Sequence, residues 1–255
     1  EELKTGYSEL VLDRWRPYLE SGLEAEQIVG RYVSSPIDIV RRVGEITVSG
    51  ELLVHTQATL TESALGSLLG GGAGILLPFA LRLSPRLTAA LDPFFAAATG
   101  VPKLALAPLL ILWFGIGIVS KVVFVAAVVF FFLFFNTLAG VRSVDPRLAA
   151  AVRIVGGREW TVTWELAWHT ALPYVFAGLK VALPRAIGAA VVGEFIAADR
   201  GLGYYINNAR AMADTVGLFT GVTLVTLLVL AIDAALERLQ ARSLAWRPLA
   251  RDVGV

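Results

Sequence analysis

The feature that constrains the fold most is a long apolar run without a single ionisable side chain. Residues 122–139 read VVFVAAVVFFFLFFNTLA, and a second run, residues 174–198, is interrupted only by Lys180, Arg185 and Glu194. A helix of about 20 apolar residues crosses the hydrocarbon core of a bilayer. Inside that core every backbone polar group has to be satisfied within the segment, which a helix achieves. We therefore expect an all-α, polytopic membrane protein.

Composition favours the same class. Of the 255 residues, 56% are hydrophobic and 17% are charged, whereas soluble domains carry about 25% charged residues. The formal net charge of +1 gives no indication of a nucleic-acid partner. The chain has no Cys, and His55 and His169 lie far apart in the sequence, so we expect no disulfide and no metal site. No cofactor and no catalytic residue are predicted.

The hydropathy pattern predicts about five visible transmembrane helices. Their approximate bounds are 61–83, 87–117, 121–140, 173–198 and 216–236. In the first of them, Gly66, Gly70 and Gly74 recur every four residues. This spacing lets two helix backbones approach closely, and a bend in a Gly-rich helix is the alternative explanation.

The second predicted span is interrupted by Pro93, Pro102 and Pro108. Membrane helices tolerate such breaks where the freed backbone faces protein or a water-filled cavity. We therefore expect this span to be tilted or broken, either along a translocation path or as a simple kink.

Few charged residues lie in or near the spans. Glu62 is expected near the outer end of the first span, where water can reach it, and Lys121 opens the third. A carboxylate at the bilayer centre costs roughly 3 kcal/mol on insertion scales. Glu194, near the end of the fourth span, is therefore expected to hydrogen-bond locally or to Arg200, with a role in transport as the alternative.

Residues 141–173 form a charged, amphipathic insert between two spans. Asp145-Pro146 is a helix start signal, because the carboxylate accepts first-turn N–H groups and Pro has no N–H to lose. Gly156-Gly157 ends the helix, since Gly adopts the left-handed cap conformation at low cost. The apolar stripe of this short helix consists of Leu148, Val152 and Val155. Spacing alone favours docking on another protein and lying on the lipid surface equally.

Three tryptophans follow the predicted helix at a regular spacing. Trp160, Trp164 and Trp168 recur every four residues. They fit an aromatic belt at a membrane–water boundary, and core packing between helices explains them nearly as well. Neither interpretation makes these residues a ligand site.

The pattern divides the chain into three parts. Residues 1–59 are mixed in charge and are expected to be extracytoplasmic or interfacial, with short amphipathic helices at 9–19 and 37–46. Residues 60–240 form the transmembrane domain, whose insert loop covers 141–172, and residues 241–255 form a basic tail. Arginines concentrate in the insert and the tail, which places both in the cytoplasm. Five spans then leave residues 1–59 outside. That placement requires either an earlier crossing or an unusual translocated N-terminus, and we expect a further helix before residue 1.

Four segments resemble permease subunits of bacterial ABC importers, in particular the family that takes up taurine, alkanesulfonates, nitrate and thiamin-precursor pyrimidines. They are LAPLLILWFGIGIVSK (106–121), NTLAGVRSVD (136–145), ALPYVFAGLK (171–180) and GEFIAADRGLGYYINNA (193–209). The family's loop signature is less complete. Gly156 and the aliphatic Leu166 are retained, but Ala150 replaces its Glu, and Trp168-His169 replaces its Leu-Pro. The resemblance covers roughly residue 34 to the C-terminus.

The resemblance implies a type I ABC importer permease fold in the bacterial cytoplasmic (inner) membrane. Two copies would form the path, two ABC ATPase subunits would bind below, and a periplasmic or lipid-anchored solute-binding protein would deliver a small, anionic or heterocyclic solute. The helix after Asp145 would be the cytoplasmic coupling helix. Its ATPase-docking residues would be Asp145, Arg147, Leu148, Ala151, Val152, Val155 and Gly156. The candidates for lining the path are Trp113, Phe114, Asn136, Glu194 and Asn207.

Two other classes of function compete with this interpretation. A membrane-embedded enzyme needs a cluster of ionisable groups at membrane depth, and the spans offer only Lys180, Arg185 and Glu194. An ion-coupled carrier needs charged residues near the midplane of several spans and an internal repeat, and the sequence shows neither. The chain also lacks a Gly-x-x-x-x-Gly-Lys-Ser/Thr phosphate loop. ATP hydrolysis is therefore expected from a partner subunit, and the chain itself is not expected to be an enzyme.

Overall fold

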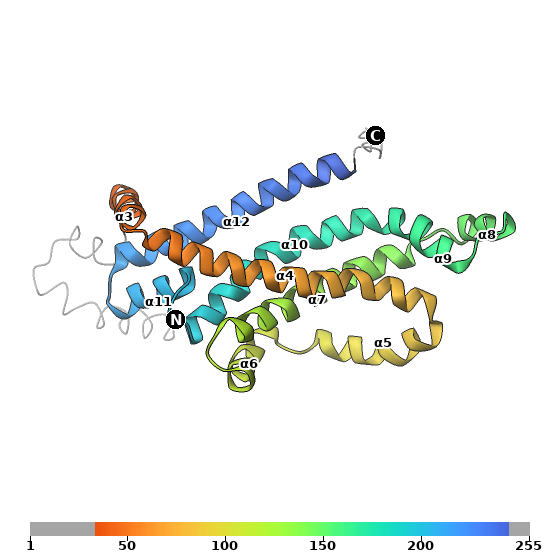
Figure 1. The fold of residues 1–255 in the computed structure, drawn as a ribbon, viewed down its shortest axis with the longest axis horizontal. Helices are drawn as coiled ribbons and strands as arrows, with labels where there is room; N and C mark the ends of the chain where they lie inside the picture. The colour runs from red at the N-terminus through yellow and green to blue at the C-terminus, as the bar shows by residue number, and fades with distance from the viewer. Residues whose placement is uncertain (1–33, 245–255) are drawn as a thin grey trace, which may run out of the picture.

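The computed structural model describes residues 34–244, and every regular element within them is a helix. Four helical segments are long and apolar enough to cross a membrane, and they run roughly along the long axis of the molecule (Figure 1). Their main helices are α4 (Glu51–Leu83), α7 (Ile118–Arg142), α10 (Trp168–Ile196) and α12 (Thr215–Ser243). The predicted all-α membrane architecture is confirmed. The helix predicted at 9–19 and the tail arginines Arg247 and Arg251 lie outside the described residues.

The core of the bundle is formed by α7 packed against both α4 and α10. At Gly66, Gly70 and Gly74 the backbone of α4 lies so close to α7 that a methyl group added at any of them would collide with it. The close approach predicted from the glycine spacing is therefore confirmed. On the other side of α7, apolar side chains such as Phe124 pack with the small residues of α10 in one buried cluster.

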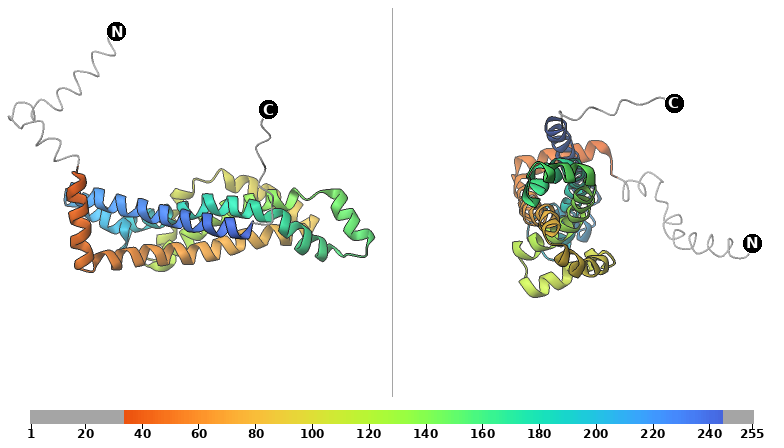
Figure 2. Two further views of the ribbon diagram at one scale, coloured as in Figure 1. Left: turned by 90° about the horizontal axis from the view of Figure 1, so that it is seen from above. Right: turned by 90° about the vertical axis from the view of Figure 1, so that its right-hand side faces the viewer.

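The connections between the long helices gather at the two ends of the bundle. The short helices α8 (Pro146–Ile154) and α9 (Glu159–Thr161) lie at one end, and α3 (Pro36–Val48) and α11 (Leu202–Ala211) lie at the other (Figures 1 and 2). The last helix, α12, starts beside α11 and runs back toward the α8 end. The insert and the end of α12 therefore lie toward the same end.

Residues 85–114 do not form one crossing helix. They consist of α5 (Pro85–Thr99), the 3₁₀ turn η1 (Lys103–Ala105) and α6 (Leu106–Phe114). Pro102 cannot donate a backbone hydrogen bond, and it disfavours the helical conformation at the residue before it. Long spanning helices therefore number four in the described part of the chain, instead of about five. The expected break is present, and the chain still passes from the α8 end toward the α11 end (Figure 1).

The helix predicted at 37–46 is α3, which lies across the end of the bundle (Figure 2). Arg42 on α3 donates to Asp214 at 2.6 Å, and Asp214 also caps α12 by accepting the N–H of Gly217 at 2.9 Å. Burial alone raises the pKa of Asp214, but these two donors, the positive charge of Arg42 and the N–H of Val216 together outweigh it and hold the pKa below its ordinary value. The ion pair therefore fastens α3 to the start of α12.

The tryptophans before and within α10 pack on α4. A π-helical turn, η2 (Val162–Ala167), leads into α10 and carries Trp164. Its indole stacks on Phe79 of α4 with ring centroids 5.5 Å apart, and Trp168 approaches the same ring at 5.5 Å. Trp160 remains exposed. Core packing thus explains Trp164 and Trp168, and the aromatic-belt interpretation is left only for Trp160.

Candidate functional site

Helix α8 is capped as its sequence predicts. The Asp145 side chain accepts the N–H of Arg147 at 2.8 Å, and Pro146 occupies the first helical position. At the other end Gly156 has a φ of 89°, in the left-handed region that favours glycine. The N–H of Gly157 then donates to the carbonyl of Val152 at 2.9 Å, which closes the helix.

Only one side of α8 is attached to the bundle. Ala149 is buried in a cluster with Phe79, and Val152 packs against the same cluster. Three other apolar side chains remain largely exposed, Leu148 at 54%, Ile154 at 85% and Val155 at 84%. Val152 thus turns toward the bundle, whereas Leu148 and Val155 stay exposed, and Ile154 is exposed on a side of the helix roughly 100–120° away from them. The docking role of these residues stays a prediction. The remaining predicted docking residues, Asp145, Arg147, Ala151 and Gly156, are also exposed.

The opposite end of the bundle contains a buried polar network around Glu194. The hydroxyl of Thr59 donates to Glu194 Oε1 at 2.7 Å, and the N–H of Gly203 donates to Oε2 at 2.5 Å. The same hydroxyl accepts the N–H of Leu202 at 2.9 Å. This network joins α4, the end of α10 and the start of α11.

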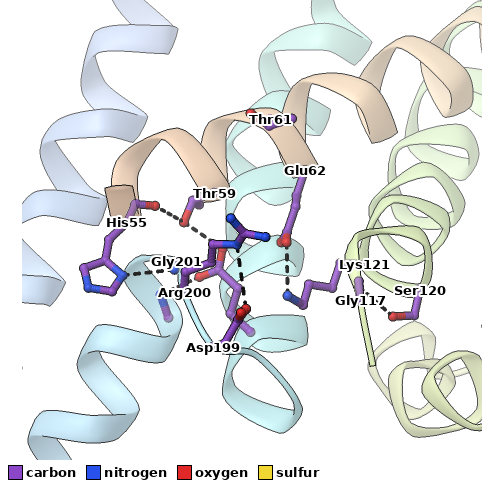
Figure 3. Close-up of polar contacts among 12 residues, drawn as sticks. His55, Thr59, Thr61, Glu62, Gly117, Ser120, Lys121, Asp199, Arg200 and Gly201 are labelled. Atoms are coloured by element: carbon purple, nitrogen blue, oxygen red, sulfur yellow. Dashed lines mark hydrogen bonds and ion pairs between the residues drawn. The ribbon is translucent and has the colours of Figure 1, made fainter. Parts of the chain in front are cut away.

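A second contact fixes the loop before α11 to α4. The N–H of Gly201 donates to His55 Nδ1 at 3.1 Å (Figure 3). Gly201 has a φ of 115°, and a side chain there would collide with the carboxylate of Glu194. Arg200, which the sequence offered as a partner for Glu194, instead lies 3.7 Å from Asp199. The pairing with Arg200 is therefore wrong and the alternative, a local hydrogen bond, is present, because the turn at Gly201 brings the backbone N–H of Gly203 to Glu194 in place of the guanidinium.

A buried ion pair lies one turn further along α4. Lys121 Nζ of α7 donates to Glu62 Oε1 at 3.1 Å, and the two side chains are only 5% and 4% exposed. The prediction that Glu62 lies within reach of water at a helix end is wrong. Because α4 begins at Glu51 and not near residue 61, Glu62 lies well inside the helix. Among the described residues, the second oxygen of Glu62, Oε2, has no hydrogen-bond partner.

Glu62 and Lys121 form part of the wall of a cavity of about 690 Å³. The wall comes from α4, the junction between α6 and α7, and the loop between α10 and α11. Figure 3 shows how Glu62, Lys121, Asp199 and Arg200 face this region. These four charges sum to zero, and Gln57 and Thr61 add uncharged polar groups. The arrangement offers hydrogen-bond donors and acceptors side by side.

None of the five path candidates lines this cavity. Trp113 and Phe114 are exposed at the end of α6. Asn136 donates within α7 at 2.8 Å, Asn207 donates to the end of α10 at 3.2 Å, and Glu194 is enclosed by its network. Their role in transport stays a prediction. Sequence reasoning missed the Glu62–Lys121 ion pair. Its signal was one acidic and one basic residue in two separate apolar spans, because charged residues inside a membrane pair with one another.

Comparison with known proteins gives the family. Residues 64–244, which include α8 and most of the cavity wall, match the family described as "Binding-protein-dependent transport system inner membrane component". The chain belongs to this family. The permease is 33% identical over 222 residues to the putative aliphatic sulfonates transport permease protein SsuC of Bacillus subtilis, covering 84% of this chain and 77% of the relative.

Two further relatives show a comparable likeness. The permease is 36% identical over 212 residues to the riboflavin transport system permease protein RibX of Chloroflexus aurantiacus, which covers 82% of this chain and 79% of the relative. It is 32% identical over 192 residues to the taurine transport system permease protein TauC of Escherichia coli, covering 75% of this chain and 70% of the relative.

Solved structures agree on the fold. An inward-facing structure of the MetNI methionine ABC transporter matches with a TM-score of 0.59 and 18% identity over 73% of this chain and 91% of that one. An amino acid ABC transporter with histidines matches with a TM-score of 0.57 and 16% identity, covering 81% and 98%. The permease is thus a multi-pass protein of the cytoplasmic membrane and a subunit of an ABC importer, and its family implies ATPase and solute-binding partners. This favours ABC import over an ion-coupled carrier or a membrane-embedded enzyme.

Proposed function

We propose that the permease works as a homodimer whose translocation path carries a small anionic or heterocyclic solute, and that α8 transmits the closure of two ATPase subunits to the spans. The exposed apolar face of α8 carries this proposal. A capped helix that holds Leu148, Ile154 and Val155 away from its own bundle exposes apolar side chains of the kind that a groove on another protein buries.

The orientation of α8 follows from the distribution of charge. The insert around α8 carries the arginines Arg142, Arg147, Arg153 and Arg158. The end of α12, which points the same way, adds Arg238 and Arg242. Positively charged residues near the ends of spans favour the cytoplasm. We therefore assign α8 to the cytoplasmic side and the cavity near Glu62 to the extracytoplasmic side, where a solute-binding protein would deliver its cargo.

The class of solute is proposed from the relatives. Their names refer to aliphatic sulfonates, taurine, riboflavin and formylaminopyrimidine. Aliphatic sulfonates are anionic, taurine carries an ammonium group beside its sulfonate, and riboflavin and formylaminopyrimidine are heterocyclic, so the relatives' names span these chemistries within one family. The second copy in the proposed homodimer, or lipid, would cover α12, of whose most apolar segment only 17% is buried.

A double substitution on α8 tests the coupling proposal. Leu148→Asp combined with Ile154→Asp removes two exposed apolar contacts and would place two carboxylates in the docking interface. Full burial of a Leu or Ile side chain contributes about 1.5–3 kcal/mol. Since both are only partly buried in the permease alone, docking would gain roughly 2–4 kcal/mol from the pair, equivalent to about 30- to 1,000-fold in affinity. We expect the ATPase subunit to be lost from the permease in a detergent pull-down.

The control uses the opposite end of the molecule. Ile37→Asp with Val48→Asp changes two exposed apolar residues of α3, at 71% and 91% exposure, and should leave co-purification intact. Undiminished co-purification of the ATPase with the α8 variant would remove α8 from the coupling role.

A further inference from the structure

A second cavity lies at the α8 end of the bundle, where α4 and α7 end and α5 begins. Its volume is about 340 Å³, within the range of small-molecule sites, about 300–1,000 Å³. Arg82 and Arg142, in the last turns of α4 and α7, both line it. Both helices are longer than the hydrocarbon core requires, so their last turns lie at the level of the lipid headgroups.

The guanidinium group of Arg82 brings an unused donor to this cavity. Its Nη1 donates to the carbonyl of Val141 at 3.4 Å, which holds the group beside the end of α7. Its Nε is enclosed, beyond the reach of a ligand. Nη2 makes no hydrogen bond within residues 34–244 and, unlike Nε, retains access to solvent. A ligand in the cavity can therefore accept a hydrogen bond from the outer part of this guanidinium.

The wall of the cavity carries a net positive charge. Its only carboxylate within the described residues is Asp92, which accepts from Nη2 of Arg142 at 3.1 Å. This pair is about half exposed, at 55% and 52%, so it is weak, and Arg142 keeps further N–H donors. Glu159 also feels the charge of Arg82, but it lies outside the wall and pairs with Arg153. Guanidinium donors from two helices suit a phosphate group.

Apolar surface adjoins these charged groups. The floor of the cavity is formed by Pro78, Leu81, Leu138 and Val141. Helix α5, which forms one side, exposes Leu87 at 44% and Phe94 at 70%. A soluble anion gains nothing from such a helix, whereas the acyl chains of a phospholipid can lie along it. Basic pockets between spans on the cytoplasmic side are sites for anionic lipid headgroups.

From this geometry, and with the orientation proposed above, we infer that the cavity binds the headgroup of an anionic phospholipid from the cytoplasmic leaflet. Arg82 and Arg142 would donate to the phosphate, and the acyl chains would lie along α5. A phosphate held by both arginines would connect the end of α4 to the end of α7. The lipid would thus act at the end of the bundle that carries α8.

Phospholipids with identical acyl chains test this assignment. Dioleoylphosphatidylglycerol is the anionic probe, and dioleoylphosphatidylcholine is the zwitterionic one. Each is titrated into the purified permease–ATPase complex in a nonionic detergent, and native mass spectrometry counts the lipids bound. We expect phosphatidylglycerol to bind at least about fivefold more tightly, because the choline group adds positive charge to a positive wall. Inorganic phosphate at about 10 mM should not displace it, because phosphate lacks the acyl chains.

Three variants locate the binding. Arg82→Gln should weaken phosphatidylglycerol binding at least about tenfold, the contribution of one charge-assisted hydrogen bond. Asp92→Asn should strengthen it about two- to fivefold, because the change removes a repulsive charge and releases Arg142 from its ion pair. Arg210→Gln removes the same charge as Arg82→Gln from an exposed position on α11, at the opposite end of the bundle, and should change neither lipid's affinity.

Three results would overturn the inference. Equal affinity for the two lipids removes the selectivity for anionic headgroups, and unchanged phosphatidylglycerol binding in Arg82→Gln removes the site. Displacement by inorganic phosphate makes it a site for soluble anions instead. If Arg82→Gln does not assemble, Asp92→Asn decides, and an affinity that fails to rise counts against the cavity.

The lipid site and the proposed function fail separately. Binding in detergent does not depend on which leaflet the cavity faces or on the contact between α8 and the ATPase. A complex that co-purifies intact but shows no preference for phosphatidylglycerol refutes only the lipid site. Undiminished co-purification of the ATPase with the α8 variant refutes the coupling role and leaves the lipid result unaffected.

Discussion

Replacing Thr59 with Val tests whether the network around Glu194 fastens α4 to the start of α11. The change nearly keeps the shape of the side chain and removes one hydroxyl. That hydroxyl donates to Glu194 at 2.7 Å and accepts the N–H of Leu202 at 2.9 Å. Two buried polar groups would lose a partner, and each costs about 1–3 kcal/mol. The free energy of unfolding should fall by at least about 2 kcal/mol, which corresponds to a Tm lower by roughly 4–8 °C for a chain of this size.

The matched control is the same substitution two residues further along α4. The hydroxyl of Thr61 is exposed and donates only to the carbonyl of Gln57 in its own helix, at 2.7 Å, so Thr61→Val should leave Tm nearly unchanged. Loss of monodisperse protein on heating in detergent measures Tm for both variants. Amide hydrogen exchange at Leu202 is the local readout and should be faster only in Thr59→Val. Equal Tm values for the two variants, or unaltered exchange at Leu202, would refute the reasoning.

Two further predictions concern packing and charge. Gly70→Ala drives a methyl group into the backbone of α7 and should lower the free energy of unfolding by about 1–3 kcal/mol. Gly72→Ala, which meets nothing within 4 Å, should be neutral or stabilising by up to about 1 kcal/mol. The heating assay compares the two variants, and an equal loss of stability in both would contradict the packing of α4 on α7. Asp214→Asn keeps a capping side chain but removes the ion pair with Arg42, which should cost up to about 1 kcal/mol at this partly exposed site. Because the pKa of Asp214 is held below its ordinary value of 3.8, the difference from wild type should be fully present above pH 3.8 and vanish as the pH falls through the lower, folded-state pKa; a difference that grows on acidification would contradict this.

The approximate positions of the spans were predictable because hydropathy is a local property. The residues at which the helices begin and end were not predictable in the same way. The first turns of α4 contain His55 and Thr59, polar residues that the sequence alone places outside a membrane helix. In the fold they bind the backbone of Gly201 and Leu202, which are far away in the chain. A partner at such a distance leaves no mark on the local pattern, so the predicted start of the helix was late.

The same distinction applies to the sites. The caps of α8 at Asp145 and Gly156 depend on neighbouring residues only, and both were predicted. Which side of α8 faces the bundle depends on where Phe79 of α4 lies, so the inward turn of Val152 could not be foreseen. The Glu62–Lys121 pair likewise joins two helices, and only its unusual charges, not the pairing, were visible in the sequence.

The cluster beneath α8 has a mechanical consequence. Ala149 shares that cluster with Phe79 of α4, Val141 at the end of α7 and Ala171 of α10, and Phe79 has no exposed surface. Close-packed interiors have almost no room for one part to move alone. If α8 is displaced as the proposed function requires, we therefore expect the cytoplasmic ends of α4, α7 and α10 to move together, instead of one helix moving alone.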